Sequence, residues 1–256
     1  MNLELVDVSI GAPFVAQVTL ARPPVNALNR QVREELIVAF GSLQDQEDVR
    51  AIVLTARGDV FCAGADIREK DALLTEGTRE GGFYNRLIRD TFFSVLESRK
   101  PVMAAVNGAA AGAGFVLAAC CDLIVAADTA FFAMPEVDVG LGGGASFLLR
   151  VLPRTKVHRM VLTGERVSAT ELYRLGAVEE CVGGSEVVPR ALAMAAEIAA
   201  KSPLATRAIK SSLMAVEELG LHQGFLLEER YSNELSRSAY AAEARRAFLE
   251  RRRPVF

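Results

Sequence analysis

The stretch from Asn107 to Gly144 most constrains what this chain can fold into. It follows a short apolar run, Pro101 to Val106, which predicts a buried strand that ends at the turn signal Asn107-Gly108. Next comes Gly112-Ala113-Gly114, where small side chains leave the backbone N–H groups open at the start of a predicted helix, Phe115 to Cys120. The glycines alone are compatible with either tight packing or a bound ligand.

A single glutamate follows this element. Asp122 to Ala127 predicts a second strand, and the run from Phe131 to Pro135 then leads Glu136 into a glycine-rich loop. A carboxylate thus arrives near a group of backbone donors. By itself, Glu136 could equally be a solvated loop side chain.

The chain on the N-terminal side of this stretch alternates strands and a helix. Phe14 to Leu20 predicts a half-buried strand, Asn29 is placed to cap an amphipathic helix, and Val49 to Ala56 predicts a buried strand. A strand, a helix and a strand in this order imply a crossover connection and an α/β fold with parallel strands.

Two later segments complete this pattern. Residues 68–91 are charged and glycine-containing with a weak helical stripe, which predicts either a mobile helical flap or an ordinary surface connection. Ser168 to Glu171 has the form of a capping box, Ala177 to Val182 predicts a short strand, and the chain is helical in pattern from Ser185 onward.

The composition excludes several functional classes. A 51% hydrophobic content in 256 residues supports a buried core, and the N-terminus resembles no signal peptide, so we expect a soluble, cytoplasmic protein. The four cysteines lack metal-site spacing, so we expect them reduced and expect no metal site. A net charge of −3 argues against nucleic acid as a partner, and no apolar run is long enough for a membrane span.

The two histidines do not suggest nucleophilic catalysis. His158 and His222 lie outside the motifs, and the chain has no G-x-S-x-G sequence around a serine nucleophile. We expect both histidines to be structural.

Several motifs together resemble one family. They are FCAGADI, KPVMAAVNG, AGAG, CDLIVAAD, PEV-x-x-GL and VLTGERVSATE, and they occur in the family's order over about residues 14 to 256. On these motifs the chain resembles the crotonase superfamily, the enoyl-CoA hydratases and isomerases.

The resemblance implies an architecture. It implies an α/β fold built as a spiral of β-β-α turns with two roughly perpendicular sheets, and a C-terminal helical region that forms trimers. We therefore expect a core over residues 1–184, a helical lobe over residues 185–256, and a homotrimer or homohexamer.

The resemblance also implies an acyl-CoA substrate and a set of site residues. The N–H groups of Ala65 and Ala113 would hold a thioester oxyanion, Glu136 would be the catalytic base, and no permanently bound cofactor is expected. The residues implied for coenzyme A are Arg22, Ala63, Asp66, Ile67 and Arg68. Those implied for the acyl pocket are Phe83, Tyr84, Leu87 and Val116.

One position departs from the hydratase pattern. Family hydratases have a first glutamate where this chain has Val116, and dienoyl isomerases have an acid where it has Gly144. Asp138 lies two residues after Glu136, and in an extended segment it would point the other way. We therefore expect an enoyl-CoA isomerase with one catalytic glutamate. A hydratase or hydratase-lyase with one glutamate, and a non-catalytic acyl-CoA or RNA binder, remain the alternatives.

Overall fold

Between residues 51 and 133, successive strands of this chain enter two sheets alternately. The computed structural model describes residues 3–11, 13–76 and 78–256. The six-stranded sheet has the order β1 (Val6–Ile10), β2 (Val15–Leu20), β3 (Ala51–Ala56), β5 (Val102–Val106), β7 (Leu123–Ala127) and β10 (Glu180–Val182). The four-stranded sheet has the order β4 (Val60–Cys62), β6 (Ala109–Ala111), β8 (Phe131–Ala133) and β9 (Arg166–Ser168).

Each of the pairs β3/β4, β5/β6 and β7/β8 places one strand in each sheet. Within either sheet, the strands from these three pairs run parallel to one another. This repetition agrees with the predicted spiral of β-β-α turns. Every residue of β3 and β5 is buried, as expected where a parallel sheet is covered on both faces. The short strands of the smaller sheet and β1 were not predicted.

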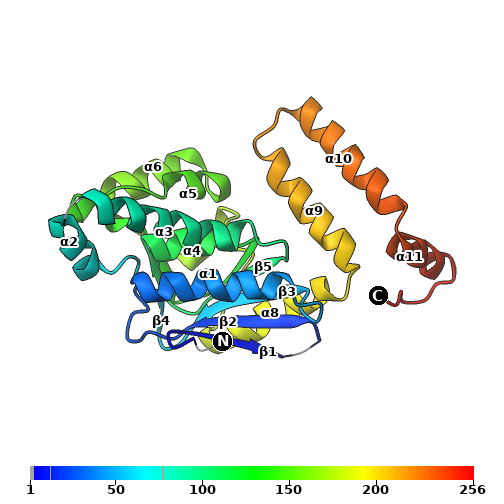
Figure 1. The fold of residues 1–256 in the computed structure, drawn as a ribbon, viewed down its shortest axis with the longest axis horizontal. Coiled ribbons are helices and arrows are strands. Elements are labelled where there is room, and N and C mark those ends of the chain that lie inside the picture. Colours follow the sequence, from blue (N-terminus) through cyan, green and yellow to red (C-terminus); the bar gives the residue numbers. More distant parts are fainter. Residues whose placement is uncertain (1–2, 12, 77) are drawn as a thin grey trace.

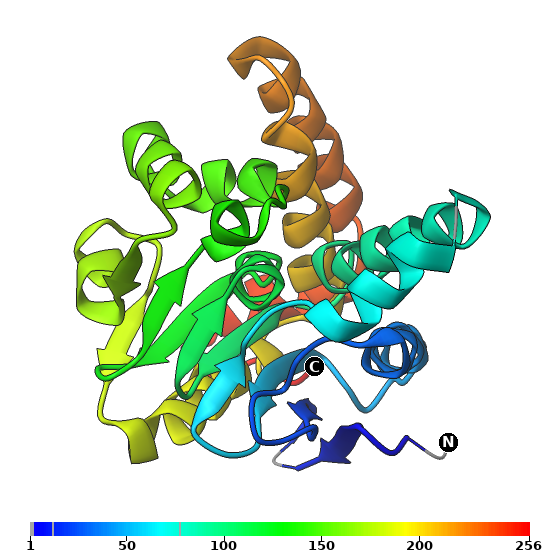
Figure 2. The same ribbon diagram turned by 90° about the vertical axis from the view of Figure 1, so that its left-hand side faces the viewer.

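Helices cover these sheets on several sides (Figures 1 and 2). The predicted cap at Asn29 is confirmed, since its side chain accepts a hydrogen bond from the Val32 N–H at 3.0 Å. The α-helices are α1 (Arg30–Gln44), α2 (Ile67–Glu76), α3 (Thr78–Leu96), α4 (Ala113–Ala119), α5 (Ala145–Val151), α6 (Arg154–Thr163), α7 (Ala169–Arg174), α8 (Val187–Ala199), α9 (Pro203–Val216), α10 (Leu221–Ser236) and α11 (Ala239–Leu249), and the short 3₁₀ helices are η1 (Pro135–Val139) and η2 (Gly184–Glu186).

The region predicted as a flap is more regular than its sequence suggests. Its described residues fall in α2 and α3, and α3 lies beside α1 (Figure 2). Within the segment, Tyr84 and Leu87 pack with Ile37 of α1, and Ile88 packs against the main hydrophobic core. The C-terminal part of the segment therefore packs on the body of the protein, and just beyond it α3 supplies Phe92 and Val95 to the core.

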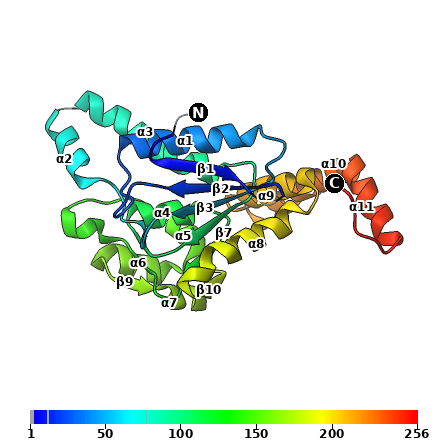
Figure 3. The ribbon, with the colours of Figure 1, turned by 90° about the horizontal axis from the view of Figure 1, so that it is seen from below.

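The chain leaves the main body only after α8. This helix runs along the six-stranded sheet (Figure 3) and buries Val187, Ala191 and Ala195 in the main core. In contrast, α9, α10 and α11 extend away from the sheets (Figure 1). The predicted domain boundary at residue 184 stays a prediction. It would lie between β10 and α8, the helix that packs on the six-stranded sheet.

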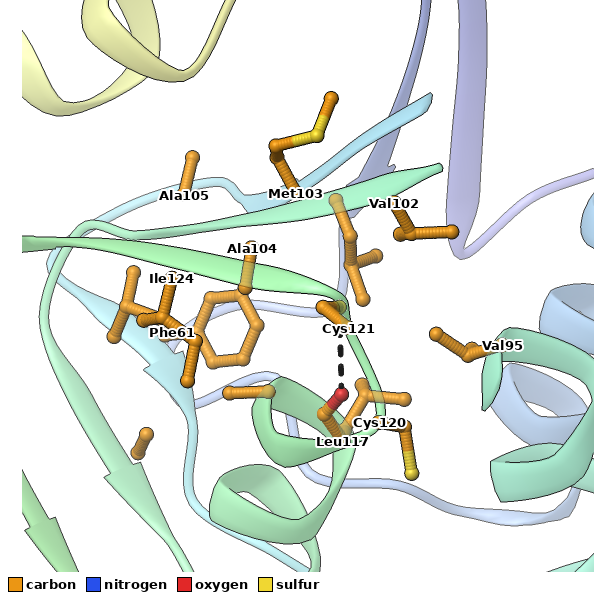
Figure 4. Packing of buried hydrophobic residues seen from close by; sticks show 14 of the residues in the cluster. Phe61, Val95, Val102, Met103, Ala104, Ala105, Leu117, Cys120, Cys121 and Ile124 are labelled. Atoms are coloured by element: carbon orange, nitrogen blue, oxygen red, sulfur yellow. Dashed lines mark hydrogen bonds between the residues drawn. The ribbon is translucent and has the colours of Figure 1, made fainter. Parts of the chain in front are cut away.

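The cysteines lie among apolar residues, and all four are free. Figure 4 shows Cys121 next to Leu117, whose carbonyl oxygen accepts a weak hydrogen bond from the Cys121 thiol at 3.6 Å. Burial raises the pKa of the Cys62 thiol to about 11, so that thiol is protonated at neutral pH. Within the described part of the chain, no helix is long and apolar enough to cross a membrane.

One close approach holds α4 against β4. A Cβ atom added to Gly114 would overlap the carbonyl oxygen of Cys62, so only glycine fits at this position. The contact fixes the start of α4 against the segment that follows β4.

We predict that Gly114→Ala destabilises the protein by about 1 to 3 kcal/mol, because backbone atoms must move to admit the methyl group. Urea unfolding should report this loss. Gly41→Ala is the matched control, since Gly41 lies in α1 with no atom near its added Cβ. That variant should gain roughly 0.5 to 1 kcal/mol. Equal midpoints for Gly114→Ala and the parent protein would refute the contact as a constraint.

Candidate active site

Glu136 lies directly against the glycine element. It belongs to η1, which follows β8, and is not in the irregular loop that the sequence predicted. A Cβ atom added to Gly112 would overlap Oε1 of Glu136, and Gly112 has a φ of +52°. Glycine at position 112 is therefore what allows the carboxylate to reach the start of α4.

The two predicted oxyanion donors lie on adjoining segments. Ala113 is the first residue of α4, so its N–H has no partner within the helix. The N–H of Ala65 donates to no backbone oxygen among the described residues. In the bridge between this segment and Leu28, the hydrogen bonds are made by the carbonyl of Gly64 and the N–H of Asp66 instead. A Cβ atom on Gly64 would lie 3.4 Å from the nitrogen of Ala113, so the two segments are in contact.

A cavity of about 400 Å³ opens beside these groups. Its wall contains both predicted donors and Glu136, together with apolar and charged side chains from α1, α2 and α3. The residues around it are Arg33, Ala63, Gly64, Ala65, Ile67, Lys70, Asn85, Ile88, Phe92, Gly112, Ala113, Val116, Pro135, Glu136, Asp138, Val139, Leu141, Gly142, Gly143 and Gly144.

The surroundings of Glu136 raise the pKa of its carboxyl, which suits a group that both accepts and releases a proton. Burial raises the pKa of its carboxyl, and a backbone hydrogen bond and the charge of Lys70 only partly offset this. Its Oε2 is buried and has no hydrogen-bond partner among the described residues. An unsatisfied carboxylate oxygen at a cavity wall can accept a proton from a bound molecule.

The other acid positions of the family contain no carboxylate. Val116 is buried in the cavity wall, and a Cβ atom on Gly144 would touch its side chain. The segment with Asp138 is a 3₁₀ helix and not the extended segment that we expected, so the expected alternation of side chains between Glu136 and Asp138 does not apply. Asp138 also lines the cavity, and its Oδ2 lies near Gly164.

Of the five residues predicted for coenzyme A, two line the cavity. Ala63 and Ile67 line it, whereas Arg68 is exposed and donates its N–H to Asp66. Arg22 forms an ion pair with Asp66 at 2.7 Å and also donates to the carbonyl of Ala27. Burial would raise the pKa of Asp66, but the hydrogen bonds from Arg22 and the backbone outweigh it and lower the pKa. Arg22 and Asp66 therefore bind each other and join the segments after β2 and β4.

Of the predicted acyl-pocket residues, only Val116 lines the cavity. Phe83 is 57% exposed, and Tyr84 and Leu87 pack toward Ile37 of α1. The cause is the direction of α3, which turns these side chains to α1 and presents Asn85, Ile88 and Phe92 to the cavity. The sequence predicted the correct helix but not its rotation.

Arg33 is a cavity residue that the sequence analysis missed. A signal was present, because Arg33 lies three and seven residues before Leu36 and Phe40 and so shares the apolar face of α1. The two histidines, His158 and His222, are both exposed and line no part of this cavity. Among the described residues, no group of three or more acidic, histidine or cysteine side chains is placed to hold a metal ion.

This arrangement can stabilise an enolate. Two backbone N–H groups next to one another can hold a developing oxyanion, and a partly buried carboxylate beside them can move a proton at the neighbouring carbon.

Comparisons with known proteins identify the family of this chain. A family model described as enoyl-CoA hydratase/isomerase matches residues 12–256. A probable enoyl-CoA hydratase from Mycobacterium leprae is 36% identical over 250 residues, which are 96% of this chain and 95% of the relative. A carnitinyl-CoA dehydratase from Proteus mirabilis is 32% identical over 248 residues, 94% of each chain.

The fold agrees with solved structures of the same group. The crystal structure of an enoyl-CoA hydratase from Mycobacterium smegmatis superposes with a TM-score of 0.91 at 32% identity and covers 98% of both chains. This match confirms the predicted crotonase fold, including its C-terminal helices. The chain therefore belongs to the enoyl-CoA hydratase/isomerase family of the crotonase superfamily and is an enzyme of that family.

Proposed function

We propose that this protein shifts the double bond of an enoyl-CoA, with Glu136 as the only carboxylate that moves the proton. Glu136 takes a proton from C2 of a 3-enoyl thioester, and the electron pair moves onto the thioester oxygen. The N–H groups of Ala65 and Ala113 donate to that oxyanion. Glu136 then returns the proton to C4, the carbonyl forms again, and the double bond ends between C2 and C3.

This proposal rests on two observations: Oε2 of Glu136 has no hydrogen-bond partner among the described residues, and an apolar residue, Val116, stands at the other acid position. A hydratase of this family uses two carboxylates to hold a water molecule, whereas a proton shuttle needs one. The buried Val116 removes the second acid and dries the adjacent wall. A carboxyl whose pKa is raised can both accept and return the proton.

Hydration, or hydration with carbon–carbon cleavage, is the second candidate. The relatives support it, since those compared above are described as a hydratase and a dehydratase. Asp138 also lines the cavity and is a possible second carboxylate for water. Under either reaction, coenzyme A enters as part of the substrate and no permanently bound cofactor takes part.

The oligomeric state and the cellular location of the protein are also part of what we propose. We propose a homotrimer, or a hexamer made of two trimers, because α9 to α11 extend from the main body with apolar side chains exposed. We also propose a cytoplasmic location, where a reducing environment suits four free cysteines. If the protein turns over no thioester, two alternatives apply: it binds acyl-CoA without catalysis, or it binds RNA.

Glu136→Gln keeps the size of the side chain but removes its basicity. We predict that solvent deuterium exchange at C2 of a bound acyl-CoA falls by about 10²-fold or more, while thioester affinity is nearly unchanged. Proton NMR of the exchanging position measures the rate. Asp138→Asn is the matched control and should keep most of the exchange.

The pH dependence of this exchange gives a further check. Because burial raises the pKa of Glu136, kcat/KM should decline as the pH falls through that raised pKa and the base becomes protonated. The residual rate of Glu136→Gln should lack this acid limb. Full exchange in Glu136→Gln, or its loss in Asp138→Asn, would instead make Asp138 the base.

Val116→Glu restores an acid at the first hydratase position. We predict a rise in hydration relative to isomerisation, measured by the absorbance of the conjugated thioester and by product chromatography. The second carboxylate would lie in the same buried wall as Glu136, so one of the two should have a further raised pKa. Val116→Gln is the neutral control. A parent protein that already hydrates faster than it isomerises would refute the isomerase proposal.

The oligomer proposal concerns the exposed residues of the last helix. Phe248 and Leu249 are each 81% exposed on α11. We predict a trimeric or hexameric mass in light scattering, and a smaller mass for the double variant Phe248→Glu with Leu249→Glu, because charge would have to be buried at the interface. Arg251→Glu is a control outside the apolar pair. A monomeric parent protein at micromolar concentration would contradict the proposal.

A further inference from the structure

Arg33 is a buried cation at the wall of the cavity. It lies on α1, its exposed fraction is only 1%, and it is among the largest fully buried side chains of the described residues. An arginine at such a position normally has an acidic partner, because an isolated buried charge is unfavourable.

The described residues supply no such partner. Nε and Nη1 of Arg33 are both buried and have no hydrogen-bond acceptor within the described part of the chain. The guanidinium carbon lies 5.9 Å from the ring centre of Tyr84 and 5.8 Å from that of Phe92, which offers weak cation–π attraction. Arg33 also interacts with the Tyr84 hydroxyl, but a neutral hydroxyl does not balance the charge of the guanidinium. The carboxylate of Glu69 accepts from the Tyr84 hydroxyl and the Arg30 N–H instead.

The same cavity wall is apolar on one part and cationic on another. Val116, Ile88 and Phe92 can contact methylene groups, whereas Arg33, Lys70 and the Asn85 amide can donate hydrogen bonds. A purely apolar acyl chain would leave the Arg33 donors unsatisfied and remove more water from them. An acyl group that ends in an anionic oxygen would satisfy them.

We infer that the preferred substrate is a CoA thioester whose acyl group carries a carboxylate at its far end, and that Arg33 binds this carboxylate. The inference rests on the proposed function, because the thioester must first lie with its oxygen at Ala65 and Ala113. Arg33 is then a specificity residue, which binds the acyl group and takes no part in proton transfer. Arginine suits the role, since its guanidinium stays charged and binds carboxylates well.

The test is calorimetric titration with saturated thioesters, which contain no double bond to shift or hydrate. Succinyl-, glutaryl- and adipyl-CoA are each compared with butyryl-, pentanoyl- and hexanoyl-CoA of the same chain length. We expect the carboxylate form to bind roughly 10- to 100-fold more tightly for at least one length, as a charge-assisted hydrogen bond would give.

Arg33→Met removes the charge and keeps the length of the side chain. We expect it to abolish the carboxylate preference and leave the affinity for the uncharged thioesters within about threefold, and we expect Arg33→Lys to keep part of the preference. Arg30→Met is the matched control, because Arg30 lies on the same helix over Phe83 and does not line the cavity. That variant should keep the full preference.

Three outcomes would overturn the inference: no preference at any length, a preference that survives in Arg33→Met, or one that is also lost in Arg30→Met. Arg33→Met should melt no lower than the parent protein, because it removes an unpaired buried charge. Arg33→Lys supplies the same comparison if Arg33→Met does not fold. Equal binding of both classes refutes only the carboxylate, whereas no binding of any thioester refutes the proposed function itself.

Discussion

The structure depends on a close backbone contact between residues 62–65, at the end of β4, and residues 111–114, at the start of α4. Gly64 and Gly114 make it possible, since an added Cβ atom at either position would overlap backbone atoms of the other segment. The contact brings the N–H groups of Ala65 and Ala113 together, and Gly112 leaves room for the Glu136 carboxylate. Packing and chemistry therefore impose the same requirement here, and a larger side chain would damage both.

Electrostatics around this contact supports the proposed use of one carboxylate. Glu136 is buried enough to have a raised pKa, and Val116 occupies the other acid position as part of the apolar wall. Two carboxylates in such a wall would each make the other harder to ionise. A single carboxylate avoids that cost and keeps its proton exchange with the substrate, which is the physical basis of the isomerase proposal.

The outer wall of the cavity is formed by α1, α2 and α3, whose exact packing the family resemblance did not predict. α3 lies beside α1, and this packing determines which side chains reach the cavity. This packing turns Tyr84 and Leu87 toward α1. It brings Ile88 and Phe92 of α3 to the cavity wall, which Arg33 of α1 also lines. The outer wall of the cavity thus depends on the packing of two helices, whereas its inner wall depends on the glycine contact.

The sequence by itself determined the main strands, the capped helix at Asn29, the crotonase family, and three residues that meet at the cavity, Ala65, Ala113 and Glu136. These features are local in the chain: apolar runs, cap residues, and the motifs around Ala65, Ala113 and Glu136. Only the tertiary structure decided the 3₁₀ geometry that brings Asp138 to the cavity and the ion pair between Arg22 and Asp66. It also decided that Nε and Nη1 of Arg33 are buried with no acceptor among the described residues. Each of these depends on how distant segments pack or on the rotation of a helix about its axis. A periodic pattern places a residue on a face, but it does not show which neighbour that face will meet.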